Sequence, residues 1–356
     1  MKQSGVDEIA PQGGVVGMNV LKDAVDLVFA VLAAGLEPAR DVHQQSVPPI
    51  APGRDHLETA VPEERGKLGR SVERGSPYVV AFRSLHPCDD TRRSVSDASE
   101  TWHHGLVARW WAEFNTATPI ELAFYRTIIE RYGQPALDLA CGTGRLLLPL
   151  RRDGLEVDGC DISTDMIGFC RAQAAREGLA PELFVQASSE LHLPRTYRTI
   201  YICDSFGIAG STEALQRCYH HLAPGGALAF NVHLPYQEAD RWNCWLPEHR
   251  RSLPEAWPDT GMRKRAANGD EIELRSRRLS LDPLEQVWTR EIRATLWRNS
   301  EVLKEEVHGL RERAFFRNEV LLLLAQAGFA DVAVKGDYDE RDVKEDDLML
   351  VFIARK

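Results

Sequence analysis

The chain has 356 residues, of which 44% are hydrophobic and 27% are charged, a balance typical of an ordinary soluble globular protein with one large domain or two smaller ones. Its formal net charge of −10 argues against nonspecific attraction to nucleic acid phosphates or to anionic lipid. We therefore expect neither a nucleic acid nor a membrane as a partner.

The seven cysteines are scattered and none forms a C-x-x-C pair, so neither structural zinc nor a disulfide framework is expected. The longest apolar stretch near the N-terminus, residues 27–36, is too short to span a bilayer. It follows Lys22 and Asp23, which makes it a poor signal peptide. These features predict a cytoplasmic protein without a metal site.

Residues 1–98 differ in composition from the rest of the chain. Leucine and valine recur at helical spacing over residues 18–36 and predict one amphipathic helix. Residues 47–99 are rich in proline, arginine, serine, glycine and aspartate, and such a segment cannot bury enough apolar surface to offset its chain entropy. We interpret residues 1–98 as a disordered or non-core extension; the alternative is a regulatory arm.

Regular periodicity begins near Trp102. Apolar residues at helical spacing predict two helices with a break at Thr118-Pro119. Strands and helices then alternate, and this alternation predicts a parallel sheet with helices on both faces. The expected strands cover residues 136–140, 156–161, 182–186, 199–204 and 227–234, and the expected helices cover residues 144–152, 164–177 and 213–222.

Residues 271–312 break this alternation. Three longer strands are expected over residues 271–281, 286–298 and 301–312, and Asp282-Pro283-Leu284 is a tight-turn sequence. Sequential strands without helices predict an antiparallel layer inserted into the parallel domain. The chain closes with a helix over 318–327, stopped by Gly328, and a strand pair over 331–335 and 348–353.

The first strand runs into a glycine loop. Gly142 and Gly144 let the backbone turn sharply and approach a ligand, which meets the free N–H groups of a helix start. Asp161 ends the second strand, nineteen positions beyond Gly142, where a carboxylate can bind ribose hydroxyls. NAD and S-adenosylmethionine both fit this geometry. Leu147 occupies the third glycine position of the NAD fingerprint, which disfavours an NAD-dependent oxidoreductase.

The segment Leu137-Asp138-Leu139-Ala140-Cys141-Gly142-Thr143-Gly144 closely resembles motif I of class I S-adenosylmethionine-dependent methyltransferases. Three further segments resemble motifs of that family in the same order: Gly159-Cys160-Asp161-Ile162-Ser163 followed by Met166, then Leu222-Ala223-Pro224-Gly225-Gly226, and last Gly328-Phe329 with the closing strand pair. The resemblance covers roughly 250 residues. It implies an α/β fold with a Rossmann-like, doubly wound, seven-stranded sheet whose last strand is reversed.

The resemblance also divides the chain. Residues 136–234 and 316–356 would form the methyltransferase core, and residues 99–135 a helical N-terminal lid over the cofactor. Residues 235–315 would form an antiparallel β insertion that caps the acceptor site. This insertion resembles that of N-methyltransferases acting on glycine-like compounds and on nucleotide-linked amino sugars.

The same resemblance implies roles for single residues toward S-adenosylmethionine. Asp161 would accept bonds from both ribose hydroxyls, and Ser188 stands where the family usually has an aspartate near the adenine amine. Asp204 would face the methyl group, and Arg126 would bind the methionine carboxylate. The other cofactor contacts expected are Asp138, Ala140, Cys141, Gly142, Gly144, Ile162 and Met166.

Some of these residues have simpler explanations. Asp138 and Asp161 could cap a turn or the following helix, and Met166 could be an ordinary core residue. The pairs His103-His104 and His220-His221 are interpreted as surface or packing residues rather than as metal ligands.

His233, at the end of the fifth expected strand, is the candidate general base, with Tyr236 close behind it. The alternative is a hydrogen-bonded structural histidine, because a base is needed only where the acceptor must lose a proton early. Arg241 belongs to a group of basic residues that precede the long strands expected in the insertion. Solvated loops explain most of that group, but some members could bind an anionic acceptor.

The sequence therefore predicts transfer of a methyl group to a nitrogen or oxygen of a small molecule. Asp204-Ser205-Phe206-Gly207 lacks both prolines of the motif that nucleic-acid amino methyltransferases carry after the fourth strand, which disfavours a nucleic acid acceptor. The alternative is a cofactor-binding interaction or sensor protein without catalysis. Neither the acceptor nor the oligomeric state follows from the sequence.

Overall fold

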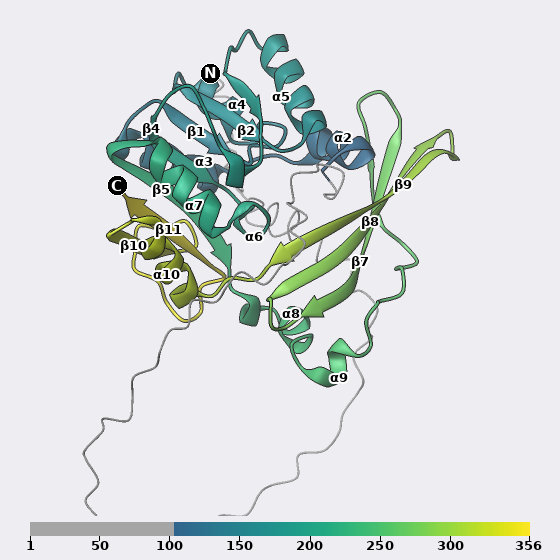
Figure 1. The fold of residues 1–356 in the computed structure, drawn as a ribbon. Helices are drawn as coiled ribbons and strands as arrows, with labels where there is room; N and C mark the ends of the chain where they lie inside the picture. The colour runs from purple at the N-terminus through teal and green to yellow at the C-terminus, as the bar shows by residue number, and fades with distance from the viewer. Residues whose placement is uncertain (1–102) are drawn as a thin grey trace, which may run out of the picture. The chain divides into compact units, whose positions relative to one another are not determined.

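The computed structural model describes residues 103–356, so the predictions made for residues 1–98, including the helix over 18–36, lie outside the described part. Within it, seven strands form one sheet (Figure 1). These strands are β1 (Ala136–Leu139), β2 (Val157–Asp161), β3 (Leu183–Val185), β4 (Tyr197–Ile202), β5 (Leu222–His233), β10 (Asp331–Gly336) and β11 (Met349–Arg355).

The strand order of this sheet is β10-β11-β5-β4-β1-β2-β3. Strands β1 to β5 pair in parallel, so that Leu137 lies opposite Asp158 on one side and Ile200 on the other. Strand β11 runs antiparallel to both β5 and β10, with Phe352 opposite Phe230. The predicted doubly wound sheet with a reversed last strand is therefore confirmed.

Helices cover both faces of this sheet because its strands bury apolar side chains on both sides. Helices α7 (Thr212–His221) and α10 (Arg317–Ala327) pack on the face that carries Leu139 and Phe230. Helices α3 (Pro119–Tyr132), α4 (Leu147–Arg152) and α5 (Thr164–Arg176) pack on the face that carries Ala136 and Tyr201.

Local sequence determines where two of these helices begin or end. Thr118 caps α3: its side chain accepts from the backbone N–H of Glu121, whose side chain accepts from the N–H of Thr118, and Pro119 occupies the first helical position. Gly328 ends α10 in the left-handed conformation, at φ 108°.

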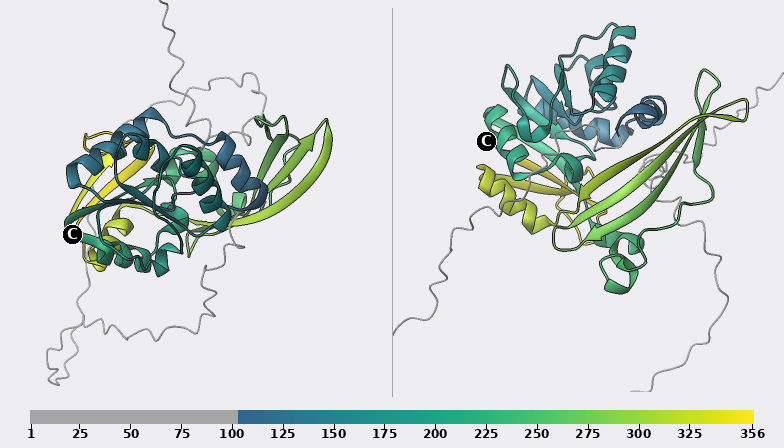
Figure 2. Two further views of the ribbon diagram at one scale, coloured as in Figure 1. Left: turned by 90° about the horizontal axis from the view of Figure 1, so that it is seen from above. Right: turned by 45° about the vertical axis from the view of Figure 1, so that its right-hand side comes forward.

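A second sheet, of four antiparallel strands, follows β5 in the chain. Its strands are β6 (Met262–Arg265), β7 (Glu271–Asp282), β8 (Val287–Arg298) and β9 (Glu301–Arg313). Figures 1 and 2 show β7, β8 and β9 as long neighbouring strands in a layer of their own. Asp282 forms the predicted turn, because its Oδ1 accepts from the backbone N–H of Leu284 at 2.9 Å and of Glu285 at 3.1 Å.

Several short elements were not predicted because they are too brief for a periodic pattern to appear. They are η2 (Ser188–Glu190), α6 (Phe206–Ala209), η3 (Pro235–Gln237), α8 (Ala239–Asn243), α9 (Pro247–Arg250) and β6. Two of these short helices contribute to the cavity described below: Ile208 and Ala209 of α6 and Arg241 of α8 line it.

Helix α2 (Gly105–Phe114) packs on the four-stranded sheet. Its buried residues form one apolar core with residues of β7, β8 and β9: Leu106, Val107, Trp110, Ile272, Ile292 and Leu310. The first backbone N–H groups of a helix have no partner within it. Here Gly105 donates to Asp165 of α5 at 2.7 Å, and Leu106 donates to Glu306 of β9 at 2.7 Å. The start of α2 is thus bonded to both layers.

Two predictions from the sequence concern membrane-spanning helices and the state of the cysteines. Among residues 103–356, no helix combines the length and the apolar composition that crossing a bilayer requires. The six cysteines of that range are free and buried.

Candidate active site

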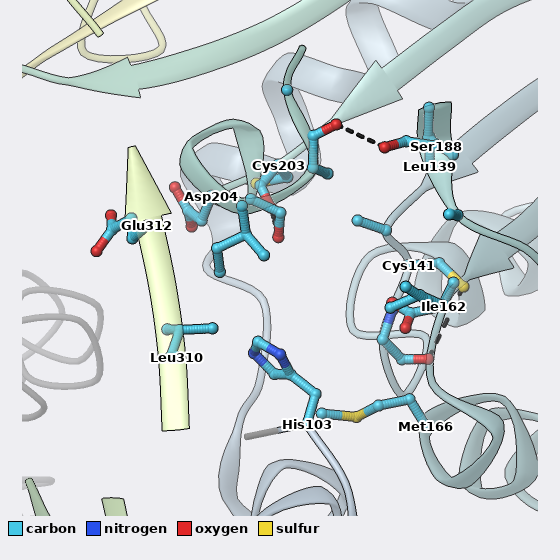
Figure 3. A pocket seen from close by; sticks show the side chains of 18 of the residues that line it. His103, Leu139, Cys141, Ile162, Met166, Ser188, Cys203, Asp204, Leu310 and Glu312 are labelled. Atoms are coloured by element: carbon cyan, nitrogen blue, oxygen red, sulfur yellow. Dashed lines mark hydrogen bonds between the residues drawn. The ribbon is translucent and has the colours of Figure 1, made fainter. Parts of the chain in front are cut away.

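A cavity of about 540 Å³ opens at the carboxyl ends of β1, β2 and β4, a size within the roughly 300–1,000 Å³ usual for ligand pockets. Open α/β sheets bind their ligands at this end of the strands. In Figure 3, Leu310 and Glu312 of β9 lie on one side of the cavity, and Ile162 and Met166 lie on the opposite side. The seven-stranded sheet and the insertion therefore both contribute to its wall.

The glycine loop after β1 forms the floor of this cavity. Ala140, Gly142 and Gly144 all have positive φ angles, of 63°, 55° and 87°. A Cβ atom at Gly144 would lie 2.7 Å from Cys170 Sγ, so no larger residue fits there. A Cβ at Gly142 would contact only Met166 Sδ, at 4.0 Å, so the positive φ angle rather than a lack of space favours glycine there.

Asp161 stands at the end of β2 with 8% of its surface exposed. Its Oδ2 accepts from the backbone N–H of Gly142 at 2.8 Å, and its Oδ1 accepts from that of Ser163 at 2.8 Å. Burial raises the pKa of Asp161, although these backbone bonds favour its charged form. Each oxygen keeps a further lone pair, so the carboxylate can accept from two ribose hydroxyls.

Ser188 also lines the cavity, at the start of η2. Its hydroxyl donates to the carbonyl oxygen of Ala209 at 2.5 Å. The hydroxyl proton of Ser188 is therefore used in this bond to the backbone, and the hydroxyl oxygen can still accept a hydrogen bond from an adenine amine. The other predicted cofactor residues that line the cavity are Ala140, Cys141, Gly142, Ile162, Met166 and Asp204.

Four predicted residues lie outside the lining of this cavity. Gly144, at the end of the loop, faces Cys170 and Leu148, and Asp138 lies within β1, where burial raises its pKa to about 7. Arg126 projects from α3 toward the solvent, with its side chain 42% exposed and paired with Asp153. Tyr236 is 48% exposed. Neither Arg126 nor Tyr236 reaches the position that the sequence suggested.

Asp204, two residues after the end of β4, lines the cavity and takes part in several hydrogen bonds there. Its backbone lies in the left-handed region, at φ 54°, and Asn231 of β5 holds it there through two bonds. The N–H of Asp204 donates to Asn231 Oδ1 at 2.7 Å, and Asn231 Nδ2 donates to Asp204 Oδ1 at 2.6 Å. Tyr338 donates to the same Oδ1 at 3.3 Å, and Arg145 donates to Oδ2 at 3.2 Å.

Arg145, the residue after the glycine loop, links Asp204 to a buried glutamate. Its Nη1 donates to Glu121 Oε1 at 2.6 Å and to Oε2 at 2.7 Å, and Glu121 is fully buried. Ligand atoms of Glu121, Cys203 and Asp204 lie within 4.8 Å of one another, a spacing that would suit a metal ion. The guanidinium of Arg145 contacts both carboxylates, however, so this cluster is an ion-pair network.

His233, at the end of β5, also lines the cavity, and its Nε2 lies 3.5 Å from Asp204 Oδ1. This distance exceeds that of a good hydrogen bond, so the contact is mainly electrostatic. Burial alone would lower the pKa of His233, but the charge of Asp204 raises it above the ordinary value. Burial likewise opposes ionisation of Asp204, yet His233 and Arg145 hold the pKa of that carboxyl well below its usual range.

The sequence did not identify several residues that line the cavity. His103 was interpreted as a surface or packing residue, but it lines the cavity, where burial and the neighbouring His104 lower its pKa to about 4. Arg145, Arg290 and Glu312 were also missed. For Arg290 the available signal was the register of β8, because a charged residue at a buried position of an alternating strand points inward.

Residues 136–226 match a family model described as a methyltransferase domain. A protein of Geobacillus sp. (strain WCH70), provisionally named a methyltransferase, is 30% identical over 141 residues, which represent 36% of this chain and 57% of that protein. A ubiquinone biosynthesis O-methyltransferase of Photorhabdus laumondii subsp. laumondii is 26% identical over 138 residues, again 36% of this chain and 57% of the relative. The match thus spans little more than half the length of these curated relatives.

Two solved structures share the fold. An S-adenosylmethionine-dependent methyltransferase from Clostridium acetobutylicum has a TM-score of 0.52 and 17% identity, and the match covers 68% of this chain and 92% of that one. The CcbJ methyltransferase from Streptomyces caelestis has a TM-score of 0.54 and 18% identity, and the match covers 72% of this chain and 98% of that one. At such identities the likeness concerns the fold alone.

Proposed function

We propose that this chain, which carries a methyltransferase domain and has the class I S-adenosylmethionine-dependent methyltransferase fold, transfers a methyl group to a nitrogen or oxygen of a small molecule. The observation that carries the proposal is one shared cavity. The glycine loop and Asp161 line one part of it, and Asp204 and His233 line another. A donor and an acceptor can therefore meet inside it.

The residues present fit S-adenosylmethionine. Asp161 offers lone pairs to the ribose, Ile162 and Met166 offer apolar surface to the adenine, and Ser188 offers an acceptor to its amine. In this proposal Ala140, Cys141 and Gly142 line the methionine portion. Gly144 lets the loop pack closely against Cys170, and Asp138 is buried in β1 just before the loop.

The reaction needs alignment and exclusion of water more than it needs a covalent group. S-adenosylmethionine, when bound, supplies a methyl group whose bond to a positively charged sulfur breaks as a lone pair of the acceptor attacks the methyl carbon from the opposite side. Asn231 and Arg145 hold the Asp204 carboxylate in one position beside the site of transfer. His233 is placed to take the proton that the acceptor nitrogen or oxygen loses.

We further propose that residues 99–135 form a lid and residues 235–315 a cap over this site. Three residues of the proposed lid line the cavity: His103 precedes α2, Trp111 lies in its last turns, and Asn115 directly follows it. Arg290 and Glu312 line it from the insertion. Both segments thus contribute to excluding water, which strengthens the electrostatic contacts inside.

A small-molecule acceptor is supported by the modest size of the cavity and by the ubiquinone biosynthesis O-methyltransferase among the relatives. To test the function, the protein would be titrated with S-adenosylhomocysteine and with NADH, and then screened against small amines and hydroxylated compounds for release of S-adenosylhomocysteine. We expect binding of S-adenosylhomocysteine only, and turnover with at least one acceptor. Binding of NADH alone would contradict the proposal, and cofactor binding without turnover across a broad screen would favour a sensor protein.

The raised pKa of His233 predicts how the methylation rate depends on pH. An imidazole accepts a proton only in its neutral form, so the rate should rise with pH and reach half its maximum above pH ~6.5. In the variant His233→Gln this titration should disappear from the profile of kcat/KM. A profile that is the same in both proteins would exclude His233 as the base.

A further inference from the structure

Asn231 is a buried polar residue in an apolar strand. Residues 226–232 of β5 are all buried, and the others among them are glycine, alanine, leucine, phenylalanine and valine. Only 2% of the surface of Asn231 is exposed, and the residue does not line the cavity. A buried amide costs free energy unless its oxygen and its nitrogen both have hydrogen-bond partners. The partners of Asn231 therefore indicate its role.

Both ends of the Asn231 amide bond to Asp204. Asn231 Oδ1 accepts from the backbone N–H of Asp204 at 2.7 Å, and Asn231 Nδ2 donates to Asp204 Oδ1 at 2.6 Å. Nδ2 also lies 3.7 Å from Met349 Sδ, and a thioether sulfur is only a weak acceptor. Asn231 thus holds the backbone and the carboxylate of Asp204 together, at a φ of 54° that is uncommon for a residue other than glycine.

Two other described side chains donate to the Asp204 carboxylate, at longer distances. Arg145 donates to Oδ2 at 3.2 Å, and Tyr338 donates to Oδ1 at 3.3 Å. The first distance lies at the upper end of the usual range for an N–H donor, and the second exceeds the range of about 2.5–3.0 Å for a hydroxyl donor. Asn231 therefore makes the shortest bond to Oδ1.

His233 contacts the same carboxylate oxygen. Residues two apart on a strand point to the same side, so Asn231 and His233 lie on one face of β5. His233 Nε2 is 3.5 Å from Asp204 Oδ1, the oxygen that Asn231 holds. Burial lowers the pKa of His233 and Asp204 raises it most, while Arg241 of α8 and Glu312 of β9 act less and in opposite directions.

We propose that Asn231 is a positioning residue: it holds Asp204 Oδ1 beside the His233 imidazole and thereby sets how readily that imidazole takes up a proton. The inference rests on the proposed methyl transfer with His233 as its base. The contact of 3.5 Å between His233 and Asp204 is too long to fix the carboxylate by itself. Because an electrostatic interaction weakens with distance, the carboxylate acts on His233 only where another group holds it nearby.

Loss of Asn231 should turn the Asp204 carboxylate away from His233. Arg145 is then the charged donor that remains, and it lies on the Oδ2 side. The backbone N–H of Asp204 also loses its acceptor, so the left-handed conformation is held less firmly. With Oδ1 farther away, burial lowers the pKa of His233 against less opposition, and a base of lower pKa accepts a proton less readily.

The test is a measurement of the pKa of His233 by NMR titration of the histidine rings in the full chain, which has 11 histidines. The variant His233→Gln assigns the resonance. We expect Asp204→Asn to lower the pKa of His233, because it removes the charge. Asn231→Ala should lower it by at least half as much, because the charge remains but is no longer held close. The midpoint of the kcat/KM profile should move to lower pH by the same amount.

Further variants separate this role from general damage to the fold. Asn231→Leu has about the size of the amide and none of its polar atoms, and it is the second test should Asn231→Ala fold poorly. Thr199→Val is the matched control, because Thr199 is fully buried on the neighbouring strand β4 and does not line the cavity. Its hydroxyl donates to the carbonyl oxygen of Gly133 at 2.9 Å, so the variant loses a buried hydrogen bond and should leave the pKa of His233 unchanged.

An unchanged pKa of His233 in the folded Asn231 variants, or an equal decrease in Thr199→Val, would overturn the inference. The titration needs neither acceptor nor turnover, which keeps it distinct from the test of methyl transfer. A lower pKa in Asn231→Ala, in a protein that methylates nothing, would contradict methyl transfer and leave the positioning of His233 standing. Turnover by Asn231→Ala with the dependence of kcat/KM on pH that the wild type shows would do the reverse.

Discussion

Replacement of Asp161 with alanine is expected to weaken the binding of S-adenosylhomocysteine by about 10- to 100-fold, or roughly 1.5–3 kcal/mol. The substitution removes the only carboxylate that we assign to the ribose, and with it two charge-assisted bonds. It also releases the backbone N–H groups of Gly142 and Ser163, which Asp161 now accepts from at 2.8 Å. Calorimetric titration with S-adenosylhomocysteine measures the loss directly.

Two further variants separate the role of Asp161 from general damage to the fold. Asp161→Asn keeps the shape but replaces one acceptor by a donor, so its affinity should fall between that of the wild type and that of Asp161→Ala. Asp158→Asn lies on the same strand with its carboxylate turned toward Arg195 and Tyr197, outside the cavity lining, and should bind as the wild type does. Unchanged affinity in Asp161→Ala would refute the assignment to ribose.

Replacement of Glu121 with alanine should lower the free energy of unfolding by about 3–5 kcal/mol, the usual cost of removing one partner of a buried ion pair. Glu121 is fully buried and accepts from Arg145 through both carboxylate oxygens. Burial alone would lower the pKa of Arg145, but the neighbouring Cys203, Glu121 and Asp204 hold it well above its ordinary value. The guanidinium would therefore remain charged and lose its main counterion.

Urea denaturation of the variants measures this cost. Asp153→Ala is the matched control, because it removes the carboxylate of an ion pair whose side chains are 42% and 39% exposed, and it should change stability by less than about 1 kcal/mol. The double variant Glu121→Met with Arg145→Met should recover part of the loss, since Arg145 is then no longer left without Glu121, while Asp204, which loses Arg145, keeps its bonds with Asn231. A cost for Glu121→Ala as small as for Asp153→Ala would show that the network contributes little to the fold.

The main sheet could be predicted because its strands and helices have strong local signals. Strand β2 is buried throughout, ends at the predicted Asp161, and is followed by a helix that Ser163 caps. The insertion was equally visible, since β7, β8 and β9 are long and the turn at Asp282 is typical. Strand β6 and helix α8 were missed, because four or five residues cannot establish a period.

Among the residues that line the cavity, those that we assign to the cofactor were predicted better than those that we assign to the acceptor. Residues of the glycine loop and Asp161 owe their positions to the strand they end, so sequence order alone places them. Arg290 and Glu312 meet only through the pairing of β8 with β9 and the packing of that sheet beside the core. Arg126 was predicted to bind the cofactor, but it does not line the cavity and is 42% exposed. The direction of a side chain on α3 depends on how the helix packs, and its place in the sequence does not reveal this.

The capping of α2 has a consequence for folding. The two backbone bonds at its start join residues separated by 60 and by 200 positions in the chain. Contacts between distant residues require large loops to close first, at a cost in entropy that later contacts must offset. Neither bond can form until α5 and β9 are in place, so we expect the start of α2 to acquire these two caps late in folding, whenever the rest of the helix forms.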